Sequence, residues 1–318
     1  MTPHPPAEKP TLYFIGVTTS KSSIMKVFPQ WARFLELGDC RIKGIDFQPH
    51  DDPARYREAV AFIKSDPLSL GALVTTHKID LLKACRDQFD RLDEFAELMG
   101  EISSISKSLD GRRLIGHAKD PLTSGLALDA FLPERHWEKT GAEAFVLGAG
   151  GSAIAVTWHM TQKKLGADRP SRIIVANRSR PRLDEIRRLH AEWDTGMALE
   201  YQLTPAPEMS DAIVGRLKPG SLVINATGLG KDAPGSPLTD RAVFPMNGLV
   251  WEFNYRGDLL FLEQARRQQA ARALRIEDGW VYFLHGWTRV IAEVFHKEIP
   301  ARGPVFDELS RIAAAARK

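Results

Sequence analysis

Cysteine is scarce in this chain. Cys40 and Cys85 are the only two among 318 residues, and they lie far apart in the sequence. Small extracellular proteins often carry a framework of disulfides, whereas a few isolated cysteines are usual in a reducing compartment. We therefore expect a cytoplasmic protein without a disulfide framework. The two cysteines give no indication of a metal site.

Long hydrophobic runs are missing as well. No stretch approaches the roughly eighteen apolar residues that a membrane-spanning helix needs. The first ten residues, MTPHPPAEKP, are polar and rich in proline, and they lack the apolar centre of a signal peptide. The sequence therefore predicts no membrane partner.

Excess charge of either sign is also small. The chain has 43 Lys and Arg against 40 Asp and Glu, a net charge of +3. This balance gives no reason to expect nucleic acid as a partner, although it suits an anionic ligand. The basic run ARRQQAARALR is most simply a solvated helix face. We expect a monomer or homodimer that binds a small molecule.

The chain does contain two halves in which strands and helices alternate. In the first half, the predicted strands are TLYFIGV, RIKGIDF, LGALVTT and EISSIS, and helical patterns cover 24–37 and 53–65. Asp110-Gly111 is a typical hairpin turn between two short apolar runs. Alternation of this kind predicts an α/β fold with a mostly parallel sheet.

The second half restarts with the strand AFVL, a glycine-rich turn and a helix from near Ser152. Further strands are predicted at RIIVANR, SLVINAT and GLVWEF, which together indicate a doubly wound sheet of the Rossmann type. Residues 124–141 are predicted to connect the halves. Two last helices, at 286–299 and 305–318, are expected to pack back on the first half.

The glycine-rich turn contains Gly148, Gly150 and Gly151. A helix N-terminus offers unpaired N–H groups and partial positive charge, which favour a pyrophosphate, and a side chain there would hold the ligand away from the backbone. The strand before and the helix after are the context that dinucleotide binding requires. The alternative is a purely structural turn.

The end of the next strand indicates which dinucleotide binds. An acid there would hold the ribose of NAD, whereas Asn177 is followed by Arg178, Arg180 and Arg182. No acid occurs before Asp184, which is already in the following helix. Guanidinium groups suit the 2′-phosphate of NADP, so NADP is favoured and NAD remains possible.

Lys78 lies where the strand 71–76 meets a helix beginning near Ile79. Ligands of α/β sheets bind at such strand ends. On position alone, a solvated lysine is the simpler interpretation, because most lysines are exposed. The alternative is a lysine that handles a proton.

Eight motifs in order resemble the shikimate dehydrogenase family, which includes quinate dehydrogenases. They are Ser20-Lys21-Ser22, Lys78 in VTTHK, Asp120 in GHAKD, Gly148 to Gly151, Asn177 to Ser179, Asn225 to Thr227, Glu252 to Tyr255, and Asp278-Gly279. The resemblance covers most of the chain. It implies a substrate-binding catalytic domain at 1–123 with 286–318, and an NADP-binding domain at 124–285.

The resemblance also implies that Lys78 and Asp120 are catalytic. In the family, a lysine and an aspartate form hydrogen bonds with one ring hydroxyl of the substrate. They transfer the proton of this hydroxyl as hydride moves to the nicotinamide. Lysine suits this role when burial or a nearby cation lowers its pKa, whereas an adjacent carboxylate raises the pKa and fixes the position of the amine. For Asp120 the alternative is a helix N-cap before Pro121.

Other roles carried over from the family concern ligand contacts. Ser20, Ser22 and Tyr255 are expected to bind the substrate carboxylate; the alternatives are a helix N-cap for the serines and a half-buried strand residue for the tyrosine. The further expected substrate contacts are Thr75, Ser103 and His285. The expected cofactor contacts are Gly148, Ala149, Gly150, Gly151, Ser152, Asn177, Arg178, Ser179, Arg182, Thr227, Gly228 and Gly279.

The chain departs from the family pattern at ring contacts. Ala118-Lys119 stands where the family has Asn-Thr before the aspartate, and Ser103-Ser104 replaces another Asn-Thr pair. A proline is missing between Thr75 and Lys78, which leaves the register of Thr75 and Thr76 open. His285 or Gly286 stands nearest to a family glutamine.

These departures favour a change in which ring hydroxyls of the substrate the site prefers. A substrate that leaves a buried polar group of the site without a hydrogen bond is strongly disfavoured, so different side chains at these positions select a different ring. The predicted activity is NADP-dependent interconversion of an alcohol and a ketone on a shikimate- or quinate-type ring acid. Alternatives are a dehydrogenase of another cyclitol or aminated ring, and an NAD-dependent quinate or shikimate dehydrogenase. A non-catalytic metabolite sensor is a further alternative, which the presence of both Lys78 and Asp120 disfavours.

Overall fold

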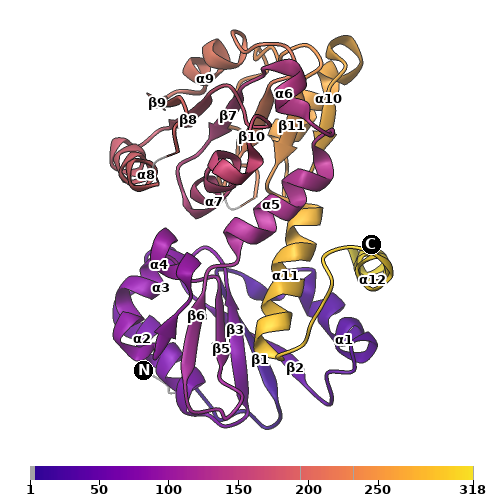
Figure 1. The fold of residues 1–318 in the computed structure, drawn as a ribbon. Helices are drawn as coiled ribbons and strands as arrows, with labels where there is room; N and C mark the ends of the chain where they lie inside the picture. Colours follow the sequence, from indigo (N-terminus) through magenta and orange to yellow (C-terminus); the bar gives the residue numbers. More distant parts are fainter. Residues whose placement is uncertain (1–3, 194, 232, 318) are drawn as a thin grey trace. The chain divides into compact units, whose positions relative to one another are not determined.

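A computed structural model describes residues 4–193, 195–231 and 233–317 (Figure 1). The chain divides into two units, one formed by 1–120 with 284–318 and the other by 121–283. The divisions fall at the start of helix α5 and inside helix α11. No helix in the described part of the chain is long and apolar enough to cross a membrane.

The second unit is built on a six-stranded sheet in the order β12-β11-β10-β7-β8-β9, and every pair of neighbours is parallel. Its strands are β7 (Ala144–Leu147), β8 (Ile173–Asn177), β9 (Leu199–Leu203), β10 (Leu222–Asn225), β11 (Leu249–Glu252) and β12 (Arg275–Glu277). The order reverses between β7 and β10, which is the switch point where doubly wound sheets bind ligands. The predicted α/β fold is confirmed.

Helices flank this sheet (Figure 1). They are α5 (Asp120–Phe131), α6 (His136–Thr140), α7 (Gly151–Thr161), α8 (Arg180–Glu192), α9 (Pro207–Val214) and α10 (Leu260–Arg272), with a short 3₁₀ helix, η3 (Lys163–Leu165). All residues of β7 and β10 are buried, as expected for central parallel strands covered on both faces. Val214 and Phe261 belong to the apolar cluster on one face.

The first unit has a six-stranded sheet in the order β2-β1-β3-β5-β6-β4. Its strands are β1 (Thr11–Gly16), β2 (Arg41–Asp46), β3 (Ser69–Val74), β4 (Arg91–Leu92), β5 (Ser104–Lys107) and β6 (Leu114–His117). The sheet is parallel except at β5, which runs antiparallel to both β3 and β6. The β5–β6 hairpin turns at the predicted Asp110-Gly111, where Gly111 has a positive φ of 71°.

Helices cover both faces of the first sheet. They are α1 (Ile24–Phe34), α2 (Pro53–Ser65), α3 (Lys78–Cys85), α4 (Glu94–Met99), α11 (Trp280–Val294) and α12 (Pro304–Arg317), with 3₁₀ turns η1 (Thr19–Lys21) and η2 (Arg86–Gln88). Tyr56 and Leu81 pack from α2 and α3 onto one face. On the other face, Trp287 of α11 contacts Phe14 with ring centroids 5.0 Å apart.

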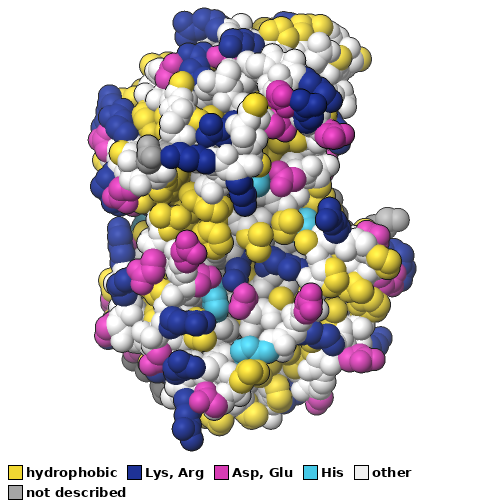
Figure 2. Space-filling model, in the orientation of Figure 1, with side chains coloured by type: hydrophobic (Ala, Val, Ile, Leu, Met, Phe, Trp, Pro, Cys, Tyr) yellow, Lys and Arg dark blue, Asp and Glu magenta, His cyan; other side chains and the backbone are white. Residues whose placement is uncertain are grey.

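The C-terminal helix α12 packs on α1. Trp31 is fully buried, and its indole N–H donates to the carbonyl oxygen of Leu309 at 2.8 Å. The last helices therefore belong to the first unit although they follow the second in sequence. Figure 2 shows Lys and Arg side chains interspersed with acids over the face in view, in keeping with the small net charge.

Candidate functional site

Lys78 and Asp120 form an ion pair in the first unit. Lys78 is the first residue of α3, and its Nζ donates a hydrogen bond to Oδ2 of Asp120, the first residue of α5. The two side chains are only 15% and 8% exposed. A solvated surface lysine, the simpler interpretation of Lys78 from its position, is therefore wrong.

The pKa of Lys78 is raised. Burial opposes its positive charge, but the carboxylates of Asp120 and Glu101 and the hydrogen bond to Asp120 favour it more. Of the environments considered from the sequence, the structure contains both burial and the adjacent carboxylate, and the carboxylates outweigh burial. Lys78 is thus an ammonium group in the resting protein, able to donate a proton or a hydrogen bond.

The segment leading to Asp120 is held by Ser103. The backbone N–H of Ser103 donates to the carbonyl oxygen of His117 at 2.9 Å, and its Oγ accepts from the N–H of Lys119 at 2.7 Å. Ser103 is 4% exposed. Its hydroxyl oxygen therefore supports the backbone beside Asp120, and the expected contact of Ser103 with a substrate ring remains a prediction.

Lys119 lies in a network of charged groups that sequence reasoning missed. Its Nζ contacts Glu293 of α11 at 2.6 Å and Asp93 at 3.5 Å. Asp93 also contacts His117 Nδ1 at 3.2 Å, and His117 Nε2 lies 2.8 Å from the hydroxyl of Ser106. Lys119 lowers the pKa of Glu293 against the raising effect of burial. The ammonium group of Lys119, the residue before Asp120, is therefore paired with the carboxylates of Glu293 and Asp93.

The other expected substrate contacts in the first unit lie at strand ends or in turns. Ser20 is exposed in η1, and Ser22 is 6% exposed. The residue at the N-cap of α1 is Ser23, so neither Ser20 nor Ser22 occupies that position. Thr75 follows β3, and its backbone N–H donates to the carbonyl oxygen of Ile15 at 3.0 Å.

His285 lies in α11 and packs against α12. Its ring stacks on Phe306 with centroids 4.5 Å apart and an interplanar angle of 10°. The side chain is buried and Nδ1 has no hydrogen-bond partner among the described residues. Burial lowers the pKa of His285 to about 4, so the ring is neutral.

A cavity of about 610 Å³ opens at the carboxyl ends of β7, β8 and β10 in the second unit. Among the expected cofactor contacts, those that line it are Gly148, Ala149, Gly150, Asn177, Arg178, Ser179, Arg182, Thr227 and Gly228. Gly151, Ser152 and Gly279 are not among the lining residues. The lining also includes residues that sequence reasoning missed, such as Thr204, Pro205 and Ser210, which follow β9 or belong to α9.

Two glycines of the turn have different reasons to be glycine. Gly148 has a φ of +114°, and a Cβ there would lie 2.7 Å from the carbonyl oxygen of Ala226, so the fold itself requires glycine. A Cβ at Gly150 would meet nothing within 4 Å. Packing does not require glycine at 150, which fits a position where a ligand approaches the backbone.

The two arginines of the cavity differ in their partners. Arg182 contacts Glu185 at 2.9 Å on the same helix. Arg178 is exposed and has no hydrogen bond or ion pair with any other described residue. A free guanidinium beside the ends of β8 and β9 is suited to a phosphate group.

Tyr255 belongs to the second unit and follows β11, so it is not a strand residue. Its ring contacts Phe283 with centroids 4.5 Å apart. In the same segment Glu252 is fully buried and accepts hydrogen bonds from Asn225 at 2.7 Å and from Asn254 at 2.8 Å. Burial raises the pKa of Glu252 to about 7 against these bonds.

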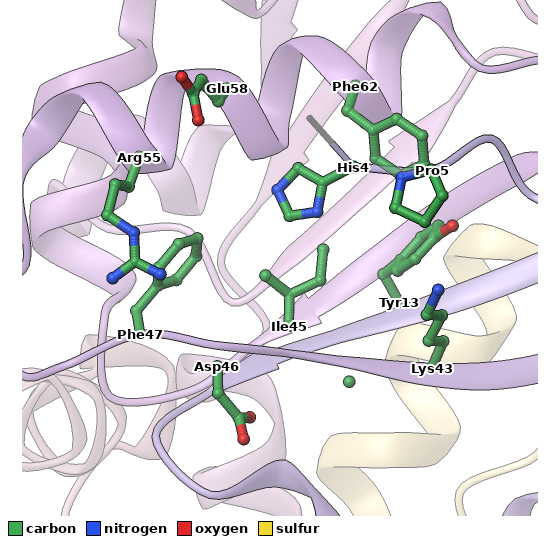
Figure 3. Close-up of a pocket in the computed structure, with 11 residues that line it drawn as sticks. His4, Pro5, Tyr13, Lys43, Ile45, Asp46, Phe47, Arg55, Glu58 and Phe62 are labelled. Atoms are coloured by element: carbon green, nitrogen blue, oxygen red, sulfur yellow. The ribbon is translucent and has the colours of Figure 1, made fainter. Parts of the chain in front are cut away.

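The first unit has a separate cavity of about 370 Å³ over β2 and α2 (Figure 3). His4 stacks on Phe62 with ring centroids 5.3 Å apart, and Arg55 lies over the ring of Phe47 at 5.2 Å. Lys43, Asp46 and Glu58 complete its charged lining. None of the candidate substrate or cofactor residues lines this cavity.

No protein-family model matches the chain. It is similar to the shikimate dehydrogenase (NADP(+)) of Symbiobacterium thermophilum, with 31% identity over 218 residues. The match covers 68% of each chain, so it spans about two thirds of that relative's length.

Solved structures share the fold over nearly the whole chain. One is a shikimate dehydrogenase in complex with NADP+, with a TM-score of 0.70 and 16% identity over 98% of this chain and 97% of the other. Another is a quinate dehydrogenase from Corynebacterium glutamicum in complex with NAD, with a TM-score of 0.68, 16% identity and coverage of 96% and 99%.

Proposed function

The chain belongs to the shikimate dehydrogenase family, and on that premise we propose that it is an NADP-dependent oxidoreductase acting on a ring acid. It interconverts a secondary alcohol and a ketone on a carboxylated carbocyclic polyol of the shikimate or quinate type. The observation that carries this proposal is the buried Lys78–Asp120 pair, which provides a proton donor and an acceptor side by side.

Proton transfer is the task of this pair. In the reducing direction, the Lys78 ammonium donates a proton to the ketone oxygen while hydride adds to the carbonyl carbon. In the oxidising direction, the hydroxyl proton returns to the Lys78–Asp120 pair. The ion pair with Asp120 keeps the ammonium in one position, so that the donor is fixed before the reaction begins.

The cavity of the second unit fits a dinucleotide. The turn Gly148 to Gly150 and the N-terminus of α7 would hold the pyrophosphate, and Arg178 would hold the 2′-phosphate. When bound, reduced NADP would supply the hydride for ketone reduction, and oxidised NADP would accept it in the reverse direction. We further propose that the unit formed by 1–120 and 284–318 holds the substrate, with Ser20 and Ser22 on its carboxylate; the expected carboxylate contact of Tyr255, which belongs to the second unit, stays a prediction.

A cytoplasmic location is part of the proposal. Cys40 and Cys85 are both free thiols, and Cys85 is buried. Burial raises the pKa of the Cys85 thiol to about 12, so it is unreactive and serves as a packing group. Two free thiols are compatible with a reducing compartment.

The test of the function is a panel of ring substrates. Shikimate, quinate and related cyclitols are each offered with NADP and with NAD, and reduced nicotinamide is followed by absorbance. Because Ser103 and Ala118 replace amide side chains of the family, we expect shikimate to be a poor substrate, with kcat/KM below roughly 10⁴ M⁻¹s⁻¹. A related cyclic hydroxy acid or cyclitol should do better.

Three outcomes contradict parts of this proposal. Efficient oxidation of shikimate, unmatched by any other member of the panel, means that the substitutions do not alter specificity. Preference for a ring without a carboxylate removes the roles of Ser20, Ser22 and Tyr255. Tight binding of a ring acid without turnover identifies a metabolite sensor instead of an enzyme.

Cofactor choice gives a second prediction. We expect NADP to be preferred over NAD, and Arg178→Ala to raise the KM for NADP by about tenfold or more, the scale of one lost charge-assisted contact. The KM for NAD should change little. Arg180→Ala is the matched control, because Arg180 is also exposed but does not line the cavity. A wild-type protein that uses NAD equally well would show that Arg178 is only solvated.

A further inference from the structure

Glu101 is a buried carboxyl group without a partner. It lies between α4 and β5 and is 2% exposed. Neither of its carboxyl oxygens has a hydrogen-bond partner among the described residues. Burial of an unpaired carboxyl group is costly, and such groups are rare unless a function retains them. Neither packing nor a local cap accounts for an acid at this position.

The charged groups that face Glu101 belong to the candidate site. They are Lys78 at the start of α3 and Asp120 at the start of α5. The adjoining backbone is fixed to the same helix, because the N–H of Ile102 donates to the carbonyl oxygen of Lys78 at 3.2 Å. Two carboxyl groups therefore face one ammonium group in a part of the protein where only small fractions of these side chains are exposed.

The protonation of Glu101 changes near neutral pH. Burial raises its pKa to about 7, Lys78 opposes this rise, and Asp120 adds to it. Below that pH the cluster holds one ammonium and one carboxylate, with no net charge. Above it, a second carboxylate gives the cluster a net negative charge.

We propose that Glu101 is a positioning residue that controls how strongly Lys78 holds its proton. The inference deepens the proposed function and rests on it. Reduction breaks an N–H bond of Lys78 and forms the O–H bond of the product, and Glu101 exchanges no atom with the substrate. An ionised Glu101 attracts the ammonium charge and so opposes proton donation, whereas a neutral Glu101 does not. Ketone reduction therefore slows as pH rises through about 7.

The test is the pH profile of Glu101→Gln. With the best ketone of the panel and reduced NADP, the wild-type kcat should fall through an inflection near 7. The glutamine variant resembles the protonated state, so we expect this inflection to disappear. At pH 8 the variant should then be faster than the wild type by up to about tenfold, the factor that one unit of pKa represents. At pH 6 the two rates should agree.

Controls separate this effect from damage to the fold. The affinity for NADP should be unchanged. Glu143→Gln removes another buried carboxylate, one paired with Arg172, and should leave the inflection in place. Glu101→Asp keeps an acid and should retain an inflection at a shifted pH. This second variant also serves if the glutamine variant does not fold.

An unchanged inflection in Glu101→Gln overturns the inference, and so does an equal loss of rate at every pH. If only Glu101→Asp folds, an inflection at the wild-type pH overturns it. A wild-type protein that turns over no member of the panel with either nucleotide overturns the proposed function, and this inference with it.

Discussion

Replacement of Lys78 by alanine is expected to lower turnover by roughly a hundredfold or more, the effect of losing a general acid. The variant loses the ammonium group that we propose donates to the ketone oxygen, and it leaves the buried carboxylates of Asp120 and Glu101 without their cation. Affinity for NADP should change little, since the residues that line the cofactor cavity all lie in the second unit. The loss should therefore be seen in kcat and not in the KM for NADP.

The matched control for this variant is Lys83→Ala. Lys83 lies in the last turn of the same helix, α3, and is exposed. Both variants lose one lysine charge from α3, but only Lys78 is placed against Asp120. Steady-state kinetics and binding of NADP, measured by fluorescence, compare the two proteins. Turnover of Lys78→Ala within a few-fold of the wild type would remove Lys78 from the mechanism.

Replacement of Gly279 by alanine is expected to cost about 3 kcal/mol of the free energy of unfolding, the upper part of the usual range for overpacking. A Cβ at this position would lie 2.0 Å from the carbonyl oxygen of Phe253 and 2.5 Å from its carbon. These are backbone atoms, which cannot move away by a change of side-chain rotamer. The N–H of Gly279 also donates to the carbonyl oxygen of Asn254 at 3.1 Å, which fixes the two segments together.

Urea unfolding of Gly279→Ala and Gly286→Ala tests this expectation. Gly286 lies inside α11, and a Cβ there meets nothing within 4 Å, so alanine should stabilise the helix by about 0.5–1 kcal/mol. Equal stability of the two variants would mean that the chain at Phe253 yields easily. The expected cost gives Gly279 a packing reason to be glycine, independent of its predicted contact with the cofactor.

Much of the second unit could be predicted because its signals are local. The strand, glycine-rich turn and helix around Gly148 follow one another directly, and the arginines follow the next strand. Parallel strands that are neighbours in a doubly wound sheet then bring these turns to one edge. Thr204 and Pro205 were missed because they reach the cavity only through the pairing of β8 with β9. No short motif marks such residues.

In the first unit, the position of Lys78 and its possible carboxylate neighbour could be anticipated, but its surroundings could not. The partner of Lys119 is Glu293, which lies on a helix that enters the first unit only after the whole second unit. Glu101 looks like an ordinary acid after a short helix until its burial is known. Charge networks of this kind depend on contacts between distant segments, which hydrophobic periodicity does not report.

The residues that flank the hairpin of β5 and β6 limit what can stand at position 103. The hydroxyl oxygen of Ser103 accepts a hydrogen bond from the backbone N–H of Lys119 at 2.7 Å. A side chain without an acceptor atom at 103 would leave that N–H without its partner, next to Asp120 in the chain. Because the donor is backbone, a change of the side chain at 119 cannot restore the bond. Variation at 103 that keeps this bond is therefore limited to residues whose side chain carries an acceptor, such as threonine, asparagine or aspartate.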